Sequence, residues 1–187
     1  MCYFTVMTVY GKLGKHHYLM QKENKESWYI MQIRLSKRED AASMIELEHL
    51  VWTPGTTPGD IHFDSEAEFL LKSPPGSKIV VVTDDKVVGI LGYKSPIPLT
   101  SNKHVAEIDI AVHPDYQRAG IGQLLMDKMK EVAREKGYIK IALRVLSINQ
   151  KAIRFYEKNG FKQEGLLEKE FIIQGEFVDD ILMAYFL

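Results

Sequence analysis

A strand-like run leads through a glycine-bearing turn directly into an amphipathic helix, and this transition constrains the fold more than any other feature. The run is Val105 to Val112, and Gln117-Arg118-Ala119-Gly120-Ile121-Gly122 follows it. Glycines in such a turn leave backbone N–H groups open, and a helix N-terminus adds about half a positive charge. The turn therefore predicts a site for a phosphate or pyrophosphate. The alternative is a helix start whose glycines serve close packing.

The spacing of this turn differs from the two common phosphate motifs. A Walker loop needs Gly-x4-Gly-Lys-Ser/Thr, and a dinucleotide fold needs Gly-x-Gly-x-x-Gly opening a βαβ unit. The order here is Gln-x-x-Gly-x-Gly. It closely resembles the loop that cradles coenzyme A in the GCN5-related N-acetyltransferase (GNAT) family.

A second motif, Asn149 to Phe161, carries the other half of the resemblance. It matches the family pattern Asn-x-x-Ala-x-x-Phe-Tyr-x-x-x-Gly-Phe. Each position also has an ordinary structural explanation: Asn149 suits a helix N-cap and Gly160 a C-terminal cap. The two motifs lie about thirty residues apart with a strand between them, a combination typical of the family.

The rest of the chain predicts an alternation of strands and helices. Ser36 to Glu39 and Ser65 to Glu68 both read as capping boxes that open helices. Two strands, Lys78 to Thr83 and Lys86 to Tyr93, are joined by Asp84-Asp85 as a hairpin. From Met31 onward the order is β-α-α-β-β-β-α-β-α-β-β. This predicts an α/β (α+β) protein with a mixed, mostly antiparallel twisted sheet flanked by helices, as in the GNAT acyltransferase fold.

The first thirty residues differ from the remainder. They are rich in lysine and histidine without clear periodicity, whereas Met31 to Leu35 begins a clean strand. We therefore expect an N-terminal extension, residues 1–30, followed by an N-acetyltransferase domain, residues 31–187. One interpretation is that the extension reflects start-site choice and carries no chemistry. The other is an arm in which Tyr3 to Tyr10 pairs with an exposed sheet edge.

Composition excludes several classes of partner. The chain has 187 residues, of which 45% are hydrophobic and 26% charged, with a net charge of −1. This balance predicts a globular domain without a nucleic-acid partner. The single cysteine, Cys2, excludes an intrachain disulfide and supports no metal site, and it fits the cytoplasm. The apolar stretch from Cys2 to Tyr10 is too short for a membrane span.

The resemblance implies acetyl-CoA as co-substrate and assigns its binding residues. Backbone amides of the turn would hold the pyrophosphate, and Arg118 could add charge. The exposed backbone before the turn would pair with pantetheine, and one of its N–H groups would polarise the thioester carbonyl. Asn149 would contact the cofactor. The expected cofactor-binding residues are Ile110, Ala111, Val112, Gln117, Arg118, Ala119, Gly120, Ile121, Gly122, Gln123, Asn149 and Ala152.

Acetyl transfer also needs groups that move protons. Glu107 and Asp109 lie two residues apart on one strand and so share a face. Glu107 sits where many family members place a glutamate base, so we favour it over Asp109; both could equally be solvated charges. Tyr156 is the candidate general acid, because a phenol is protonated at neutral pH. Its alternative is a half-buried aromatic residue. Glu46 and Glu48 are weaker candidates for the base.

The predicted function is N-acetyl transfer from acetyl-CoA to a primary amine by direct attack in a ternary complex. The amine could belong to a small molecule, a polyamine or a protein N-terminus. In the family the acceptor pocket comes largely from the first two helices and the last hairpin, which makes Trp52, His62, Phe63 and Asp64 plausible lining residues. Two alternatives remain open: a non-catalytic acetyl-CoA sensor, and a structural domain. A homodimer is possible, and the sequence does not fix it.

Overall fold

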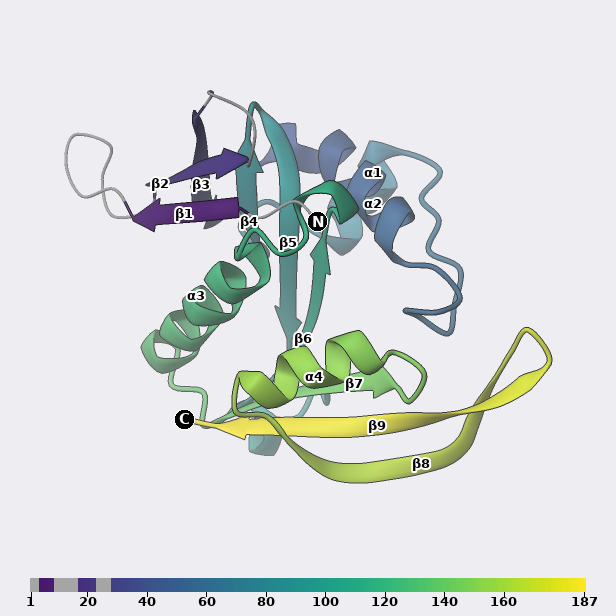
Figure 1. Cartoon of the computed structure of the whole chain (residues 1–187). Helices are drawn as coiled ribbons and strands as arrows, with labels where there is room; N and C mark the ends of the chain where they lie inside the picture. Colours follow the sequence, from purple (N-terminus) through teal and green to yellow (C-terminus); the bar gives the residue numbers. More distant parts are fainter. Residues whose placement is uncertain (1–3, 9–16, 23–27) are drawn as a thin grey trace. The chain divides into compact units, whose positions relative to one another are not determined.

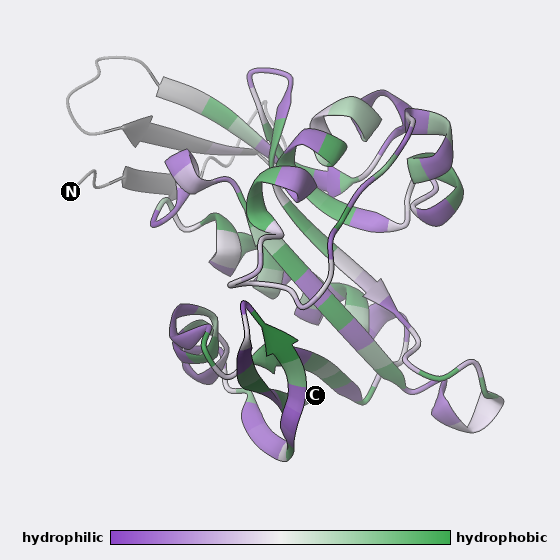
Figure 2. Ribbon diagram, turned by 90° about the vertical axis from the view of Figure 1, so that its right-hand side faces the viewer, coloured by the Kyte–Doolittle hydropathy of each residue, from purple (hydrophilic) through white to green (hydrophobic). Residues whose placement is uncertain are grey.

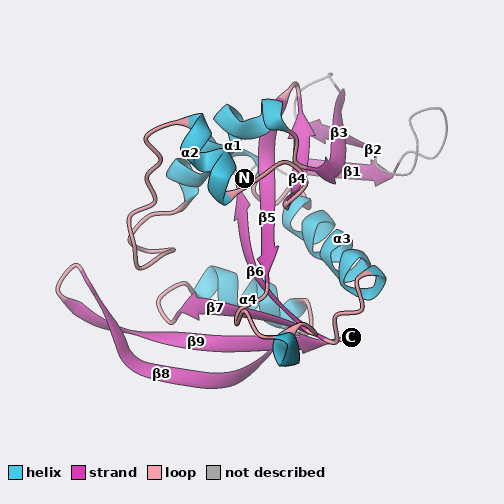
Figure 3. Cartoon of the chain, turned by 180° about the vertical axis from the view of Figure 1, so that it is seen from behind, coloured by secondary structure: helices cyan, strands magenta, loops and turns pink. Residues whose placement is uncertain are grey.

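The computed structural model describes residues 4–8, 17–22 and 28–187, and it confirms the predicted order of elements (Figure 1). Figure 3 shows the same elements by type. They are β1 (Phe4–Thr8), β2 (His17–Lys22), β3 (Trp28–Leu35), α1 (Ala41–Val51), α2 (Glu66–Lys72), β4 (Lys78–Thr83), β5 (Lys86–Lys94), β6 (Val105–Val112), α3 (Ile121–Glu135), β7 (Lys140–Leu146), α4 (Gln150–Lys158), β8 (Lys162–Ile173) and β9 (Glu176–Phe186).

The chain divides into two compact units, the first comprising residues 1–51, 63–92 and 110–129. Its strands pair in the order β1-β2-β3-β4-β5, and each pair is antiparallel. The predicted hairpin of β4 and β5 turns through Asp84 and Asp85, whose φ angles of 48° and 59° suit a primed turn.

Helices α1 and α2 pack against β4 and β5 to form the core of this unit. Apolar strand residues appear as green segments of the ribbon in Figure 2. The core cluster consists of Ala41, Met44, Leu47, Phe69, Val80, Val87 and Ile90. Burying this apolar surface, at about 25 cal/mol per Å², is what holds the two helices on the strands.

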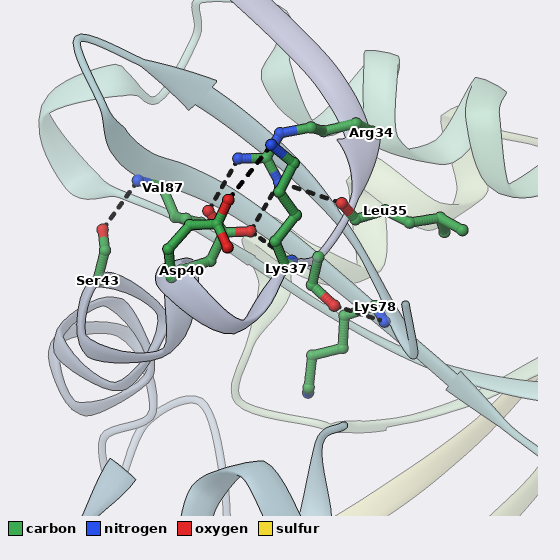
Figure 4. Close-up of polar contacts among 9 residues, drawn as sticks. Arg34, Leu35, Lys37, Asp40, Ser43, Lys78 and Val87 are labelled. Atoms are coloured by element: carbon green, nitrogen blue, oxygen red, sulfur yellow. Dashed lines mark hydrogen bonds and ion pairs between the residues drawn. The ribbon is translucent and has the colours of Figure 1, made fainter. Parts of the chain in front are cut away.

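The start of α1 differs from the prediction. Ser36 does not cap the helix, because its Oγ instead accepts a long hydrogen bond from the Lys78 backbone (3.4 Å). A short 3-10 helix, Arg38–Asp40, precedes α1, and the Asp40 carboxylate accepts from the backbone N–H of Lys37 (2.7 Å). The guanidinium of Arg34 donates two hydrogen bonds, of 2.6 and 2.8 Å, to the same carboxylate (Figure 4). The cap predicted at Ser65 is confirmed, because its Oγ accepts from the Glu68 backbone; the Glu68 carboxylate accepts from the backbone of Asp64 rather than that of Ser65, so the capping box is not complete.

The second unit comprises residues 52–62, 93–109 and 130–187. Its strands pair in the order β6-β7-β9-β8, with β6 parallel to β7 and the other pairs antiparallel. Helix α4 ends at Lys158, and Gly160, with a φ of 87°, follows the C-cap residue Asn159 as the predicted capping glycine. Three aromatic rings then contact one another in tilted pairs: Tyr156 with Phe161 and Phe161 with Tyr185, each with centroids 5.7 Å apart.

The predicted N-terminal extension contains two described strands. β1 pairs with β2, and β2 pairs with β3. β3 begins at Trp28, three residues before the predicted strand start at Met31. Tyr3 and residues 9–16 and 23–27 lie outside the described residues. The division of the chain at residue 31 stays a prediction.

No helix in the described part of the chain is both long enough and apolar enough to cross a membrane.

The Arg34–Asp40 pair predicts a pH-dependent contribution to stability. Burial tends to raise the pKa of Asp40, but the hydrogen bonds from Arg34 and from the Lys37 backbone outweigh it, so the pKa lies below its usual value. Because the pKa is lowered on folding, the ionised carboxylate stabilises the folded state at pH values above the ordinary aspartate pKa. This stabilisation is lost as the pH falls through the lowered pKa of Asp40. Asp40→Asn should therefore cost about 1–3 kcal/mol near pH 7, and the difference from wild type should shrink toward pH 3. Urea unfolding at several pH values measures this; a constant difference would contradict it.

Candidate active site

The glycine turn has the backbone geometry of an anion-binding loop. After β6, a 3-10 turn (Pro114–Tyr116) leads to Arg118 and Gly120, whose φ angles of 67° and 79° lie in the left-handed region. The first backbone hydrogen bond of α3 runs from Leu124 to Gly120 (3.0 Å). The amides of Ile121 and Gly122 therefore lie in the first helical turn, where an α-helix offers them no acceptor. Such amides can hold an anion.

Gly89 on β5 lets α3 come close to the sheet within the first unit, which sequence reasoning missed. A Cβ placed on Gly89 would lie 2.6 Å from Cγ2 of Ile121 and 3.1 Å from Cδ1 of Leu125. Both side chains are buried. A side chain at position 89 would therefore push against the first turn of α3. The signal in the sequence was a glycine inside a strand, which often marks a close approach.

The pairing between β6 and β7 covers only the first part of β6. Their pairing covers Val105 to Glu107 against Lys140 to Ala142, although β7 continues to Leu146 along β9. In the described pairing, the residues of β6 that follow Glu107, Ile108 and Asp109, are not paired with β7. In the first unit, β6 continues through Ile110–Val112, the predicted pantetheine segment.

The two candidate carboxylates on β6 differ in surroundings. Glu107 is 28% exposed and its Oε1 lies 3.9 Å from Nζ of Lys94, a weak ion pair. Asp109 is exposed. Both share one face of the strand, as predicted from their spacing.

Tyr156 is buried in α4, with 6% of its surface exposed. Burial raises the pKa of its phenol, and the negative charge of Asp109 raises it further. Both effects disfavour the phenolate, so the hydroxyl keeps its proton at neutral pH. The ring is more deeply buried than the half-buried aromatic residue considered as its alternative role, and it contacts the rings of Phe155 and Phe161.

Asn149 caps α4, which is the structural alternative considered for it. Its Oδ1 accepts a hydrogen bond from the Ala152 backbone (3.2 Å). The cap uses only the oxygen, so the Nδ2 amino group is the atom that could donate to a ligand. Ala152 is partly buried in the first turn of the same helix.

Other candidates from the sequence have structural partners. Glu48 is buried and pairs with Lys78 at 3.1 Å, an arrangement that suits stability rather than proton transfer. Glu46 is exposed and lines a pocket of about 170 Å³ in the first unit, together with His113 and Tyr116. Phe63 stacks edge-on against Phe69 with centroids 5.0 Å apart and packs against the core cluster.

A charged cluster on the second unit was not predicted. Arg144 donates from Nε to Oδ2 of Asp180 (2.5 Å) and from Nη2 to Oε1 of Glu170 (3.4 Å). These residues come from β7, β9 and β8, so only long-range pairing brings them together. The hydrogen bond with Asp180 is the main cause that raises the pKa of Arg144.

Comparison with known proteins identifies the family. The acetyltransferase (GNAT) family model matches residues 42–161. An L-amino acid N-acyltransferase, MnaT, of Escherichia coli is 24% identical over 70% of this chain and 79% of its own length. Spermidine N(1)-acetyltransferase of E. coli is 32% identical over 67% of this chain, which spans 61% of that relative. The chain spans 57% of a Vibrio cholerae spermidine N(1)-acetyltransferase and 51% of a Salmonella typhimurium [ribosomal protein bS18]-alanine N-acetyltransferase.

Solved structures share the fold. The smu.2055 protein of Streptococcus mutans superimposes with a TM-score of 0.77 at 32% identity, covering 83% of this chain and 98% of its own. The yncA acetyltransferase of Salmonella typhimurium, solved with its cofactor acetyl-CoA, gives a TM-score of 0.73 at 22% identity over 84% of this chain and 94% of its own. The chain belongs to the acetyltransferase (GNAT) family, a family of acetyl-CoA-dependent N-acetyltransferases.

The close approach at Gly89 predicts a coupled effect on stability and cofactor binding. Gly89→Ala should destabilise the fold by about 1–3 kcal/mol, because the new methyl group must displace Ile121 or the helix. The same displacement should weaken coenzyme A binding several-fold, since Ile121 is the first residue of α3, whose first-turn amides form the expected pyrophosphate site. Urea unfolding and calorimetric titration with coenzyme A measure the two effects.

Gly55→Ala is the matched control. A Cβ there meets nothing within 4 Å, and its backbone needs no left-handed conformation. This variant should keep both stability and coenzyme A affinity. Equal losses in both variants would contradict the role of the close approach.

Proposed function

We propose that this chain transfers the acetyl group of acetyl-CoA to a primary amine by direct attack in a ternary complex. The left-handed turn at Arg118 and Gly120, opening α3 directly after β6, carries this proposal. Family membership supports it, because the relatives named above acylate amino acids, spermidine and a ribosomal protein.

The described residues fit acetyl-CoA. The amides in the first turn of α3 and the helix N-terminus suit the pyrophosphate, and Arg118 is exposed beside them. We assign the backbone of Ile110–Val112 to pantetheine and to the thioester carbonyl, and the Nδ2 group of Asn149 to a further contact. Bound in this way, acetyl-CoA supplies an acetyl group activated as a thioester.

Glu107 takes the proton from the acceptor amine in this proposal, directly or through water. An alkylamine is mostly protonated at pH 7, so a base must free its lone pair before attack. Glu107 is partly exposed, and its ion pair with the exposed Lys94, at 3.9 Å, is too long to be strong. Asp109 is the alternative base on the same face.

Tyr156 donates to the leaving sulfur. Burial keeps its phenol protonated at neutral pH, so the hydroxyl can donate to the sulfur while a separate group accepts the amine proton. The raised pKa of the phenol lies well above that of a thiol. We therefore assign Tyr156 the role of a hydrogen-bond donor that stabilises the negative charge on the departing sulfur, rather than that of a group that transfers its proton fully.

The acceptor in this proposal is the primary amine of a small molecule, a polyamine or a protein N-terminus. We further propose a cytoplasmic enzyme, because the chain has a single cysteine. A homodimer is compatible with this proposal.

Two substitutions separate the roles of Glu107 and Tyr156. Tyr156→Phe should lower kcat by about 10²-fold while coenzyme A affinity changes little, because only the hydroxyl is lost. Glu107→Gln should lower kcat and remove the acidic limb of the pH–rate profile. Steady-state kinetics over pH 5–9 measure both effects. Wild-type turnover in both variants would show that the proton assignments are wrong even if the family activity holds.

An acetyl-CoA turnover screen tests the function as a whole. Thiol release should rise above background with one class among polyamines, amino acids, aminoglycosides and N-terminal peptides. Calorimetric titration with coenzyme A runs alongside it. Binding without turnover on any amine would favour the alternative, a non-catalytic acetyl-CoA sensor. Absence of binding would contradict both.

A further inference from the structure

The Arg144 cluster, defined as Arg144, Glu170 and Asp180, fixes a guanidinium in place. Asp180 is 2% exposed, whereas the side chain of Arg144 is 45% exposed. A buried carboxylate therefore holds Nε of an arginine whose side chain is still partly exposed, and Glu170 contacts its Nη2 at 3.4 Å. Such charge-assisted bonds are short and directional, and they restrict an otherwise flexible side chain.

The third member of the cluster is placed by a β-bulge. The register of β8 against β9 shifts between Leu167 and Phe171. Within this bulge Lys169 has a φ of 53°, and its N–H donates to Oδ1 of Asp179 (2.7 Å). Bulges re-aim neighbouring side chains. Glu170, the next residue, reaches Arg144 from this irregular backbone.

Strand register puts the cluster on the same face as Glu107. Glu107 pairs with Ala142 across β6 and β7, and Arg144 lies two residues further along β7. Arg144 in turn pairs with Leu182 across β9, two residues from Asp180. Paired residues and those two positions apart share a face. Arg144 therefore lies on the face of Glu107, two residues beyond Ala142, the last β7 residue paired with β6.

Electrostatics agrees with this placement. After the hydrogen bond to Asp180, the charges of Glu170 and Glu107 also raise the pKa of Arg144, while burial lowers it. Three more charged residues lie near this position: Lys94 on β5, Asp109 on β6, and Lys140 on β7, which pairs with Val105 and so shares the face of Glu107. Lys140 is itself bound to Glu164 at 2.6 Å.

We propose that Arg144 is a positioning residue for Glu107, held at a set distance by Asp180 and Glu170 so that it tunes the charge of the base without pairing with it. This inference rests on the proposed function, in which Glu107 is the base. An unrestrained arginine could form a two-point pair with Glu107 and so block its access to a proton. The buried Asp180 and the bulge-placed Glu170 compete for the guanidinium and prevent this.

Two substitutions in the cluster should move the pH–rate profile in opposite directions. Arg144→Gln removes a positive charge near Glu107, so the acidic limb of kcat should move to higher pH by about 0.5–1. Its kcat should fall about tenfold with little change in KM for acetyl-CoA. Glu170→Gln removes a negative charge at an exposed site, so it should fold and should move the limb to lower pH. Arg144→Lys should return the limb toward its wild-type position, because the charge is restored.

Arg34→Gln is the matched control, because Arg34 also forms a bonded pair with a buried aspartate. It should cost stability and leave the limb unmoved. An unmoved limb in both Arg144→Gln and Glu170→Gln, or an equal shift in Arg34→Gln, would overturn the inference. The variant Glu107→Gln separates failure of the proposed function from failure of this inference. If Glu107→Gln keeps the acidic limb, the assignment of Glu107 as the base is wrong. If it loses the limb while the Arg144 cluster variants leave the limb unmoved, only the inference about Arg144 fails.

Discussion

The packing of the first turn of α3 against β5 is the contact on which the candidate site in the first unit depends. It exists because position 89 carries no side chain, so Ile121 can occupy that space. The same residue begins the helix whose amides face the predicted pyrophosphate. A hydrophobic contact in the core thus fixes the position of a polar site. A change in the packing at Gly89 and Ile121 would therefore also move the amides of the first turn of α3.

Local features of the chain were predictable because local chemistry determines them. The Asp84-Asp85 turn, the Ser65 cap and the Gly160 helix end follow from residues within a few positions of one another. The cap at Ser36 was wrong because Arg34 and Asp40 form a stronger local arrangement, a bidentate ion pair that moves the helix start. A capping motif predicts the helix start from the type of side chain alone. It does not include competition from a nearby charged pair such as Arg34 and Asp40.

The nonlocal parts of the site could not be predicted in this way. Glycine 89 was visible in the sequence, but its neighbour Ile121 lies 32 positions away, and only the fold brings them together. The Arg144 cluster combines three strands and depends on a bulge. Tyr156 was found through the family motif, yet its degree of burial, which decides its protonation, came from the structure.

The two register shifts in β8 have a consequence for self-association. β8 ends the strand order of the second unit, and its irregular pairing spans Gln163–Gly165 and Leu167–Phe171. A free edge recruits another chain most readily when it is flat and regularly spaced, and bulges interrupt that template. β8 is thereby protected against continuous strand-to-strand growth. Contacts between copies at this edge would have to come from side chains rather than from an extended backbone ladder.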